Sequence, residues 1–182
     1  MLDKKVAIFL DRDGVINKEV NYLSDPKDFE LLEGTINALK QLKTKGYLLI
    51  IITNQAGIAR GYFTVTKLNE IHQKMIRIFK KKDLYIDDIF YCPHHPAFTG
   101  PCECRKPNPG MILEAKKKYN IDLKSSFMVG DTLNDIKTGK NAGCKTILVL
   151  TGYGTMEKKK INGIKPDYIY KNLMEFAENI KL

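Results

Sequence analysis

The stretch Val6-Ala-Ile-Phe-Leu-Asp-Arg-Asp-Gly14 joins a continuous apolar run to a pair of carboxylates. An unbroken apolar run of this length is typical of a β-strand buried on both faces, as in a parallel sheet. Asp11 and Asp13 follow at the predicted carboxyl end of that strand. Because ligands bind outside this end of the strands in open α/β sheets, the stretch predicts both a fold and the place of its site.

The rest of the chain alternates between predicted strands and helices. The predicted strands span residues 6–10, 47–52, 88–91, 127–129, 146–150 and 168–170. The predicted helices span residues 34–45, 66–82, 111–119, 135–141 and 173–180, and the segment 151–165 is predicted to be a loop. Thr66 is the predicted N-cap of the second helix. This alternation predicts an α/β fold with a doubly wound, mostly parallel sheet and right-handed crossovers.

The composition is that of a soluble globular protein. The chain has 182 residues, which predicts a single domain over residues 1–182. Hydrophobic residues make up 43% and charged residues 28%, which excludes disordered and collagen-like classes. No apolar run approaches the ~20 residues of a membrane span. The chain passes from Met1 into the first strand without an apolar signal segment, so we expect a cytoplasmic protein without a membrane partner.

The net charge of +9 raises the question of a nucleic-acid partner. Clusters such as Lys80–Lys82, Lys116–Lys118 and Lys158–Lys160 are scattered over predicted surfaces, without the interleaved aromatic residues of a single-strand binder. We therefore expect no nucleic-acid partner, and we expect a monomer. The four arginines are more informative, because Arg12, Arg60 and Arg105 lie in predicted loops at the site, where a guanidinium suits phosphate.

Polar groups follow several of the predicted strands. Thr53-Asn-Gln-Ala-Gly57 offers a hydroxyl, two amides and a glycine turn, and Arg105-Lys106 supplies positive charge. Gly130-Asp131, with Asp135 nearby, adds further carboxylates. An Asp-x-Asp pair alone is equally compatible with an ordinary turn. Together with these groups, however, one Asp can attack phosphorus while the other moves a proton, and Mg²⁺ can bind carboxylates and phosphate oxygens. The set predicts phosphoryl transfer.

The loop after the third predicted strand carries a candidate metal site. Cys92-Pro-His94-His95 precedes Cys102-Glu-Cys104, so three thiolates and one imidazole are available. Such a set is typical of tetrahedral Zn²⁺, with His94 preferred over His95 because its spacing matches that of Cys-x-Cys. A disulfide is the alternative, disfavoured in a cytoplasmic protein. Four protein ligands leave no open position, so we expect a structural zinc within residues 92–104. Cys144 is predicted to be a buried apolar residue.

The motifs Asp-x-Asp-Gly, Thr, Lys and Gly-Asp-x-x-x-Asp, in this order, resemble those of the haloacid dehalogenase (HAD) superfamily of phosphatases. The resemblance implies that Asp11 is the nucleophile and Asp13 the general acid and base. Thr53 and Lys106 would hold the phosphoryl group. Asp131 would bind Mg²⁺ together with Asp11 and the backbone carbonyl of Asp13. For Asp135 two roles stay open, a supporting group behind the ligands or a helix N-terminal charge.

The segments Asn-Gln-x-Gly-Ile-Ala-Arg-Gly, Cys-Pro-His-His-Pro and Cys-x-Cys-Arg-Lys-Pro narrow the resemblance to the heptose 1,7-bisphosphate 7-phosphatase family. It covers the chain from Val6 to about Tyr170 and implies hydrolysis of the C7 phosphate of a sugar bisphosphate in nucleotide-heptose and lipopolysaccharide biosynthesis. Substrate contacts would come from Arg105 and, more weakly, Arg60. The remaining implied substrate-binding residues are Glu19, Val20, Asn21, Tyr22, Asn54, Gln55 and Ala56.

Three other functions are compatible with part of this pattern. A histidinol-phosphate phosphatase would share the fold and the chemistry, but the cationic Arg105 and Arg60 favour a bisphosphate. A nucleic-acid 3′-phosphatase would use the net positive charge, and the absence of an aromatic–basic stripe disfavours it. A non-catalytic zinc module would need no Asp pair. The intervals from Asp13 to Thr53 and from Thr53 to Lys106 leave no room for an inserted cap domain, so we expect an open site.

Overall fold

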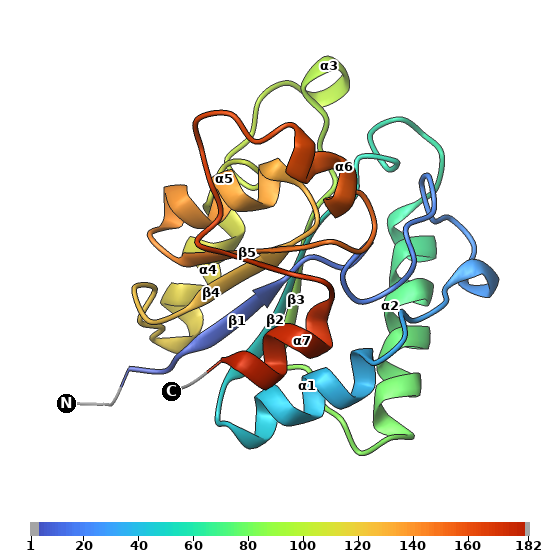
Figure 1. Ribbon diagram of the computed structural model, residues 1–182. Coiled ribbons are helices and arrows are strands. Elements are labelled where there is room, and N and C mark those ends of the chain that lie inside the picture. Colours follow the sequence, from blue (N-terminus) through green and yellow to red (C-terminus); the bar gives the residue numbers. More distant parts are fainter. Residues whose placement is uncertain (1–3, 181–182) are drawn as a thin grey trace.

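Six parallel strands form one sheet in the computed structural model, which describes residues 4–180 (Figure 1). The spatial order of the strands is β3-β2-β1-β4-β5-β6. Their bounds are β1 Ala7–Leu10, β2 Leu48–Asn54, β3 Asp88–Cys92, β4 Phe127–Gly130, β5 Lys145–Val149 and β6 Tyr168–Tyr170. From β1 the chain first adds β2 and β3 on one side of the sheet and then β4, β5 and β6 on the other side. In such sheets a crevice forms at the carboxyl ends of the strands where the chain changes sides, here β1 and β4. The predicted doubly wound parallel sheet is confirmed.

Strand β1 is buried on both faces because it lies between β2 and β4. Leu10 is in register with Ile51 of β2 and Val129 of β4. Side chains alternate between two apolar layers, with Leu10 in one layer and Phe9 in the other. This is why the apolar run of β1 is continuous rather than alternating.

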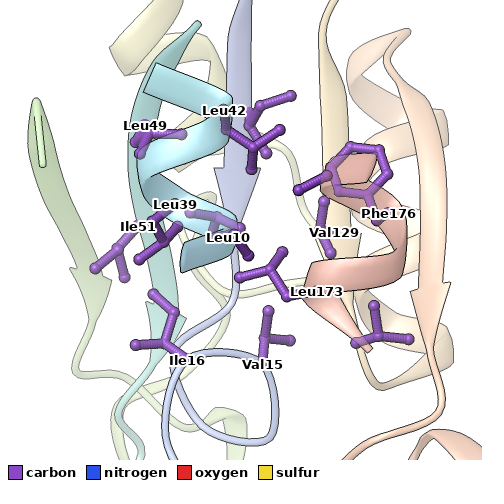
Figure 2. Close-up of a cluster of buried hydrophobic side chains, with 14 of the residues drawn as sticks. Leu10, Val15, Ile16, Leu39, Leu42, Leu49, Ile51, Val129, Leu173 and Phe176 are labelled. Atoms are coloured by element: carbon purple, nitrogen blue, oxygen red, sulfur yellow. The ribbon is translucent and has the colours of Figure 1, made fainter. Parts of the chain in front are cut away.

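Helices cover both faces of the sheet. The helices are α1 Thr35–Thr44, α2 Val65–Lys80, α3 Pro96–Thr99, α4 Gly110–Tyr119, α5 Leu133–Ala142, α6 Gly154–Lys159 and α7 Leu173–Asn179, with a 3₁₀ turn, η1, at Pro26–Asp28. Helices α1, α2 and α7 lie on one face, and α4 and α5 on the other (Figure 1). Figure 2 shows the larger layer, where Leu39 and Leu42 of α1 and Phe176 of α7 meet Leu10 and Val129.

Three local predictions were wrong. The N-cap of α2 is Thr64, whose side chain accepts a hydrogen bond from the backbone N–H of Lys67, so that Thr66 already lies inside the helix. Helix α6 forms within the segment predicted to be a loop, and Glu157 ties it to α5 by accepting a hydrogen bond from the N–H of Leu133. The short η1 and α3 were missed because they have too few residues to show a periodic pattern.

The connections between strands contain no extra folded unit in the described part of the chain. Only η1 and α1 separate β1 from β2, and only α2 separates β2 from β3. The site is therefore not covered by an inserted domain within residues 4–180. The extent of the domain, 1–182, stays a prediction, because residues 1–3 and 181–182 lie outside the described range. No helix within that range is long and apolar enough to cross a membrane.

The core layer of Figure 2 predicts a large effect of truncation. Leu42 is 0% exposed, and Leu42→Ala would leave a cavity, so we expect the free energy of unfolding to fall by about 2–5 kcal/mol. Leu113→Ala on α4 is the matched control, since Leu113 is 46% exposed and should cost about 0.5 kcal/mol or less. Urea unfolding of both variants measures the difference. Equal losses would contradict this description of the core.

Candidate active site

A pocket of about 250 Å³ lies at the carboxyl ends of the central strands. It is lined by the last residues of β2 and by the segments that follow β1, β2, β3, β4 and β5. Except for Arg60, the residues predicted to bind substrate, magnesium or the phosphoryl group line it: Asp11, Asp13, Glu19, Val20, Asn21, Tyr22, Thr53, Asn54, Gln55, Ala56, Arg105, Lys106 and Asp131. The structure therefore brings together segments that are up to 120 positions apart in the sequence, whereas the roles of these residues stay predictions.

Asp11 and Lys106 form an ion pair in the floor of the pocket. Lys106 Nζ lies 2.8 Å from Asp11 Oδ2, and its side chain is only 2% exposed. The other Asp11 oxygen accepts a hydrogen bond of 2.7 Å from the backbone N–H of Arg12. Lys106 is itself held by Asn54, whose side-chain amide bonds both the N–H and the C=O of Lys106. This arrangement fixes a cation next to a carboxylate that faces the cavity.

Asp135 lies behind this pair and serves both of the roles that the sequence left open. Its Oδ1 is 2.6 Å from Lys106 Nζ, and it is fully buried. Its Oδ2 accepts hydrogen bonds from the N–H and the hydroxyl of Thr132, which completes a capping box at the start of α5. Gly130 allows this approach, because a Cβ there would lie 2.1 Å from Asp135 Cβ. Asp135 thus supports Lys106 and caps the helix.

Asp131 is 1% exposed and lies against two glycines. A Cβ on Gly14 or on Gly152 would lie 2.1 Å from Asp131 Oδ2, and both glycines have positive φ, +77° and +51°. Larger residues would therefore clash and be strained at these two positions. The same Oδ2 accepts a hydrogen bond of 2.8 Å from the N–H of Tyr153. The other oxygen of Asp131 has no hydrogen-bond partner among residues 4–180 and is available to a cation.

Asp13 is held from several directions. Its carboxylate accepts hydrogen bonds from the guanidinium of Arg12, with Nη2 at 2.9 and 2.8 Å from the two oxygens. Asn17 donates to Oδ1 at 2.9 Å and Gln55 to Oδ2 at 3.1 Å. The same amide nitrogen of Gln55 donates to Thr53 Oγ1 at 2.9 Å. Asp13 and Thr53 are therefore fixed relative to each other on adjacent sides of the pocket.

The rim of the pocket joins three loops through aromatic contacts. Tyr22 has φ +55° and packs edge-on against Tyr62 with ring centroids 4.8 Å apart. Arg60 lies 5.8 Å from the Tyr22 ring and 5.1 Å from the Phe98 ring, and its Nη2 is 2.9 Å from His95 Nε2. Arg60 does not line the pocket, so the structure does not bring it to the place expected of a phosphate contact. It links the loops instead.

Three carboxyl groups of the pocket have raised pKa values. Burial raises the pKa of Asp11 to about 7, against the lowering effect of Lys106. Burial, with the neighbouring Asp11 and Asp135, raises the pKa of Asp131 to about 8. Burial and then Asp13 raise the pKa of Glu19 to about 7. Each shift comes first from burial, and repulsion from neighbouring carboxylates adds to it.

This excess of charge fits a cation. Five carboxylates line the pocket (Asp11, Asp13, Glu19, Asp131 and Asp135) against two cationic side chains, Arg105 and Lys106. Oxygen atoms of Asp11, Asp131 and Asp135 lie within 4.8 Å of one another. Buried like charges at such distances favour binding of a divalent ion, and oxygen donors favour Mg²⁺.

A second cluster fits a different metal. Ligand atoms of Cys92, His94, Cys102 and Cys104 lie within 4.8 Å of one another, and the four cysteines of the chain are free. The Cys92–Cys102 and Cys102–Cys104 sulfur distances are both 3.6 Å, near the ~3.7 Å edge of a tetrahedron with Zn–S bonds of ~2.3 Å, whereas the Cys92–Cys104 distance is shorter, at 2.8 Å. His94 Nδ1 lies 3.3 Å from Cys104 Sγ, whereas His95 caps α3 and contacts Arg60. The donor set fits Zn²⁺.

Comparison with known structures defines the class of protein. A family model described as HAD-hydrolase-like matches residues 103–176. The chain superposes with a TM-score of 0.90 on the D,D-heptose 1,7-bisphosphate phosphatase from B. bronchiseptica, whose crystal structure contains magnesium and phosphate. The two chains are 36% identical, and the match covers 95% of this chain and 96% of the other. The fold is that of a HAD-like phosphatase.

Sequence comparison is more specific. The chain is 43% identical to the D-glycero-beta-D-manno-heptose-1,7-bisphosphate 7-phosphatase of Pasteurella multocida, with 97% of both chains covered. It is 52% identical to the corresponding alpha enzyme of Photorhabdus laumondii, covering 84% of this chain and 86% of the relative. The chain belongs to the heptose 1,7-bisphosphate 7-phosphatase family of HAD phosphatases.

Several residues of the site were not found from the sequence. Tyr153 lines the pocket and donates its N–H to Asp131, and Asn17 donates to Asp13. His72 contacts the buried Arg12 from the middle of α2. The Thr-x-x-Asp pattern at 132–135 is a capping-box signal that could have predicted the orientation of Asp135. The other contacts depend on packing between distant segments and carry no local signal.

The raised pKa values predict a pH-dependent stability in magnesium-free buffer. The carboxyl groups of Asp11 and Asp131 titrate near 3.8 when unfolded and near 7 and 8 when folded, so the folded state binds more protons between these limits. The free energy of unfolding should therefore fall as the pH rises from about 5 to about 8.5.

Asp131→Asn removes the group with the largest of three raised pKa values, the others being Asp11 and Glu19, and we expect it to reduce this fall by at least roughly one third. Asp122→Asn is the control, because the pKa of the Asp122 carboxyl is lowered and it titrates below this range. Denaturant unfolding across the pH series measures the slopes. A stability that rises between pH 5 and 8.5, or equal slopes in the two variants, would contradict the assignment.

Proposed function

We propose that the protein removes the C7 phosphate of D-glycero-D-manno-heptose 1,7-bisphosphate. The observation that carries the proposal is the placement of Asp11 beside Lys106, 2.8 Å apart, in the floor of a pocket whose wall includes Asp13 and Arg105. A nucleophile, a proton carrier and two cations are the groups that hydrolysis of a phosphate monoester requires. The names of the relatives in P. multocida and P. laumondii support this substrate.

The reaction follows from the two aspartates. A carboxylate oxygen of Asp11 attacks phosphorus, the bond from phosphorus to the sugar oxygen breaks, and Asp13 gives its proton to that oxygen. A water molecule then attacks the phosphorus of the aspartyl phosphate and gives a proton to Asp13. The bond from phosphorus to Asp11 breaks, and phosphate leaves. Lys106 and the Thr53 hydroxyl stabilise the charge on the phosphoryl oxygens during both steps.

Mg²⁺, when bound, supplies Lewis-acid stabilisation of the phosphoryl oxygens. Asp11, Asp131 and the backbone carbonyl of Asp13 would hold it. Asp135 is less suited, since one oxygen faces Lys106 and the other accepts two hydrogen bonds from Thr132. The structure of the B. bronchiseptica relative with magnesium and phosphate supports this cofactor.

The far end of the substrate would be read by loops. Arg105 lines the pocket and donates a hydrogen bond to the C=O of His94, which fixes it to the cysteine loop. Glu19, Val20, Asn21 and Tyr22 form the opposite wall, and Asn54, Gln55 and Ala56 follow β2. A guanidinium in the wall of the pocket suits a second phosphate better than a cationic amine, which favours a bisphosphate over histidinol phosphate.

Phosphate release in the presence of Mg²⁺ tests the function. The α and β anomers of heptose 1,7-bisphosphate and histidinol phosphate are compared as kcat/KM. We expect one bisphosphate anomer to exceed histidinol phosphate by more than ~100-fold, or ~2.7 kcal/mol of transition-state discrimination. Asp11→Asn should lower kcat by at least ~10³-fold, because the nucleophile is lost. Preference for histidinol phosphate would contradict the assignment of heptose bisphosphate as the substrate. An active Asp11→Asn variant would contradict the assignment of Asp11 as the nucleophile.

Zinc would order the loop that carries Arg105 and Lys106, since both follow the ligand Cys104 directly in the chain. We expect Cys102→Ser to lose zinc, to unfold at a lower temperature and to lower kcat/KM by roughly 10- to 100-fold. Cys144→Ser is the matched control, because Cys144 is buried outside the cluster and should leave the zinc content unchanged. Metal analysis and thermal melts measure both. A fully active, equally stable Cys102→Ser would refute this role.

The four free thiols also support a cytoplasmic location, where reducing conditions keep such ligands available for zinc.

A further inference from the structure

Arg12 is a buried cation behind the active site. It lies between Asp11 and Asp13 in the sequence, but its side chain is 0% exposed and does not line the pocket. The guanidinium contacts both oxygens of Asp13 through Nη2, and Nε lies 3.2 Å from Oδ1. A planar guanidinium holding a carboxylate through two nitrogens restricts the orientation of that carboxylate. The position of Asp13 therefore depends on the position of Arg12.

His72 contacts the far side of this guanidinium. His72 Nε2 lies 3.2 Å from Arg12 Nη1, on the side away from Asp13. Arginine has only donors, so the imidazole must accept through an unprotonated Nε2 and carry its proton on Nδ1. Burial and then the charge of Arg12 lower the pKa of His72 to about 3, so the ring is neutral at physiological pH. A neutral acceptor satisfies Nη1 without placing a second cation beside Arg12.

Loss of the contact between His72 and Arg12 would leave a buried guanidinium N–H without its acceptor. A buried N–H of a charged group without a partner is strongly unfavourable, so Arg12 would shift to find another acceptor. Because the same guanidinium holds Asp13, the carboxylate would shift with it. His72 also borders a separate cavity of about 610 Å³ between α2 and β3, which gives smaller or similar side chains room at this position. A variant at His72 can therefore fold while losing the contact.

We propose that His72 is a positioning residue for the proton-transferring carboxylate of Asp13, acting through Arg12. This rests on the proposed function, in which Asp13 gives a proton to the leaving oxygen and later takes one from water. Neither His72 nor the Arg12 guanidinium touches the substrate. Both hold Asp13 in the orientation from which the proton reaches the sugar oxygen.

Dependence on the leaving group distinguishes this role from a structural one. A sugar alkoxide is a strong base and needs a proton as the bond to phosphorus breaks, whereas p-nitrophenolate is a weak base and needs almost none. The value of kcat/KM reports formation of the aspartyl phosphate for both substrates. Misplacement of Asp13 should thus affect the sugar phosphate selectively. General disruption of the pocket should affect both substrates alike.

The experiment compares His72→Leu with the wild-type enzyme, each loaded with zinc and Mg²⁺. We expect kcat/KM for the heptose bisphosphate to fall by about 10- to 100-fold, and for p-nitrophenyl phosphate by less than about 3-fold. His72→Gln, which keeps an acceptor oxygen, should recover much of the loss. Met75→Leu is the matched control, since Met75 is buried on the same helix within the apolar core. This variant should leave kcat/KM unchanged for both substrates.

Several results would overturn the proposal. These are equal losses on both substrates, no loss on either, or no recovery in His72→Gln. Nitrogen-15 NMR gives a readout independent of turnover, and an imidazolium or a protonated Nε2 at pH 7 would also refute it. If the wild-type enzyme hydrolyses histidinol phosphate but not the heptose bisphosphate, the proposed function fails, and the same comparison is made with histidinol phosphate. Absence of turnover on every substrate would overturn both proposals.

Discussion

One ammonium group, Lys106 Nζ, lies between two buried carboxylates, 2.8 Å from Asp11 and 2.6 Å from Asp135. In a buried setting, two like charges this close are tolerated only with a cation between them. The surrounding structure is arranged to keep this cation in place. Asn54 holds the backbone of Lys106, and Cys104 of the metal cluster lies two residues before it. Lys106 Nζ therefore contacts both Asp11 and Asp135, the residue that caps α5, and Lys106 itself belongs to the segment that follows the cysteine cluster.

This constraint explains why the metal site and the fold cannot be separated. The capping box that begins α5 uses Asp135, the same residue that balances Lys106. Glycines at 14, 130 and 152 are required because the carboxylates of Asp131 and Asp135 occupy the space that a Cβ would fill. The carboxylates of Asp131 and Asp135 thus determine where glycine is needed in the backbone. The contacts of Asp135 both stabilise the start of α5 and hold Lys106 in the pocket.

The sequence predicted the elements whose signal is local. Continuous apolar runs such as residues 6–10 indicated buried strands, and the residues after them indicated the site, because parallel strands bring their carboxyl ends together. The segments around Glu19 and Arg105 were assigned to the substrate only through family resemblance. Threonine suits the N-cap position, so the sequence pattern fits a helix that begins after Thr66 as well as one that begins after Thr64. Local propensity does not distinguish two threonines that are only two residues apart.

The contacts that could not be predicted are those that connect different layers of the fold. His72 reads as an ordinary residue of an amphipathic helix, and only the packing of α2 against the sheet brings it to Arg12. Asp135 reaches Lys106 from a helix on the opposite face.

The two aspartates that follow β1, Asp11 and Asp13, are consequently supported from both faces of the sheet. Asp13 is supported through Arg12 and α2, and Asp11 through Lys106 and α5. A pocket without an inserted domain above it has only its floor and its loops to position the reacting groups. Phosphoryl transfer depends chiefly on such positioning. Support from both faces fixes the reacting groups in the floor of the pocket. Recognition of the rest of the substrate is left to the loops at the rim.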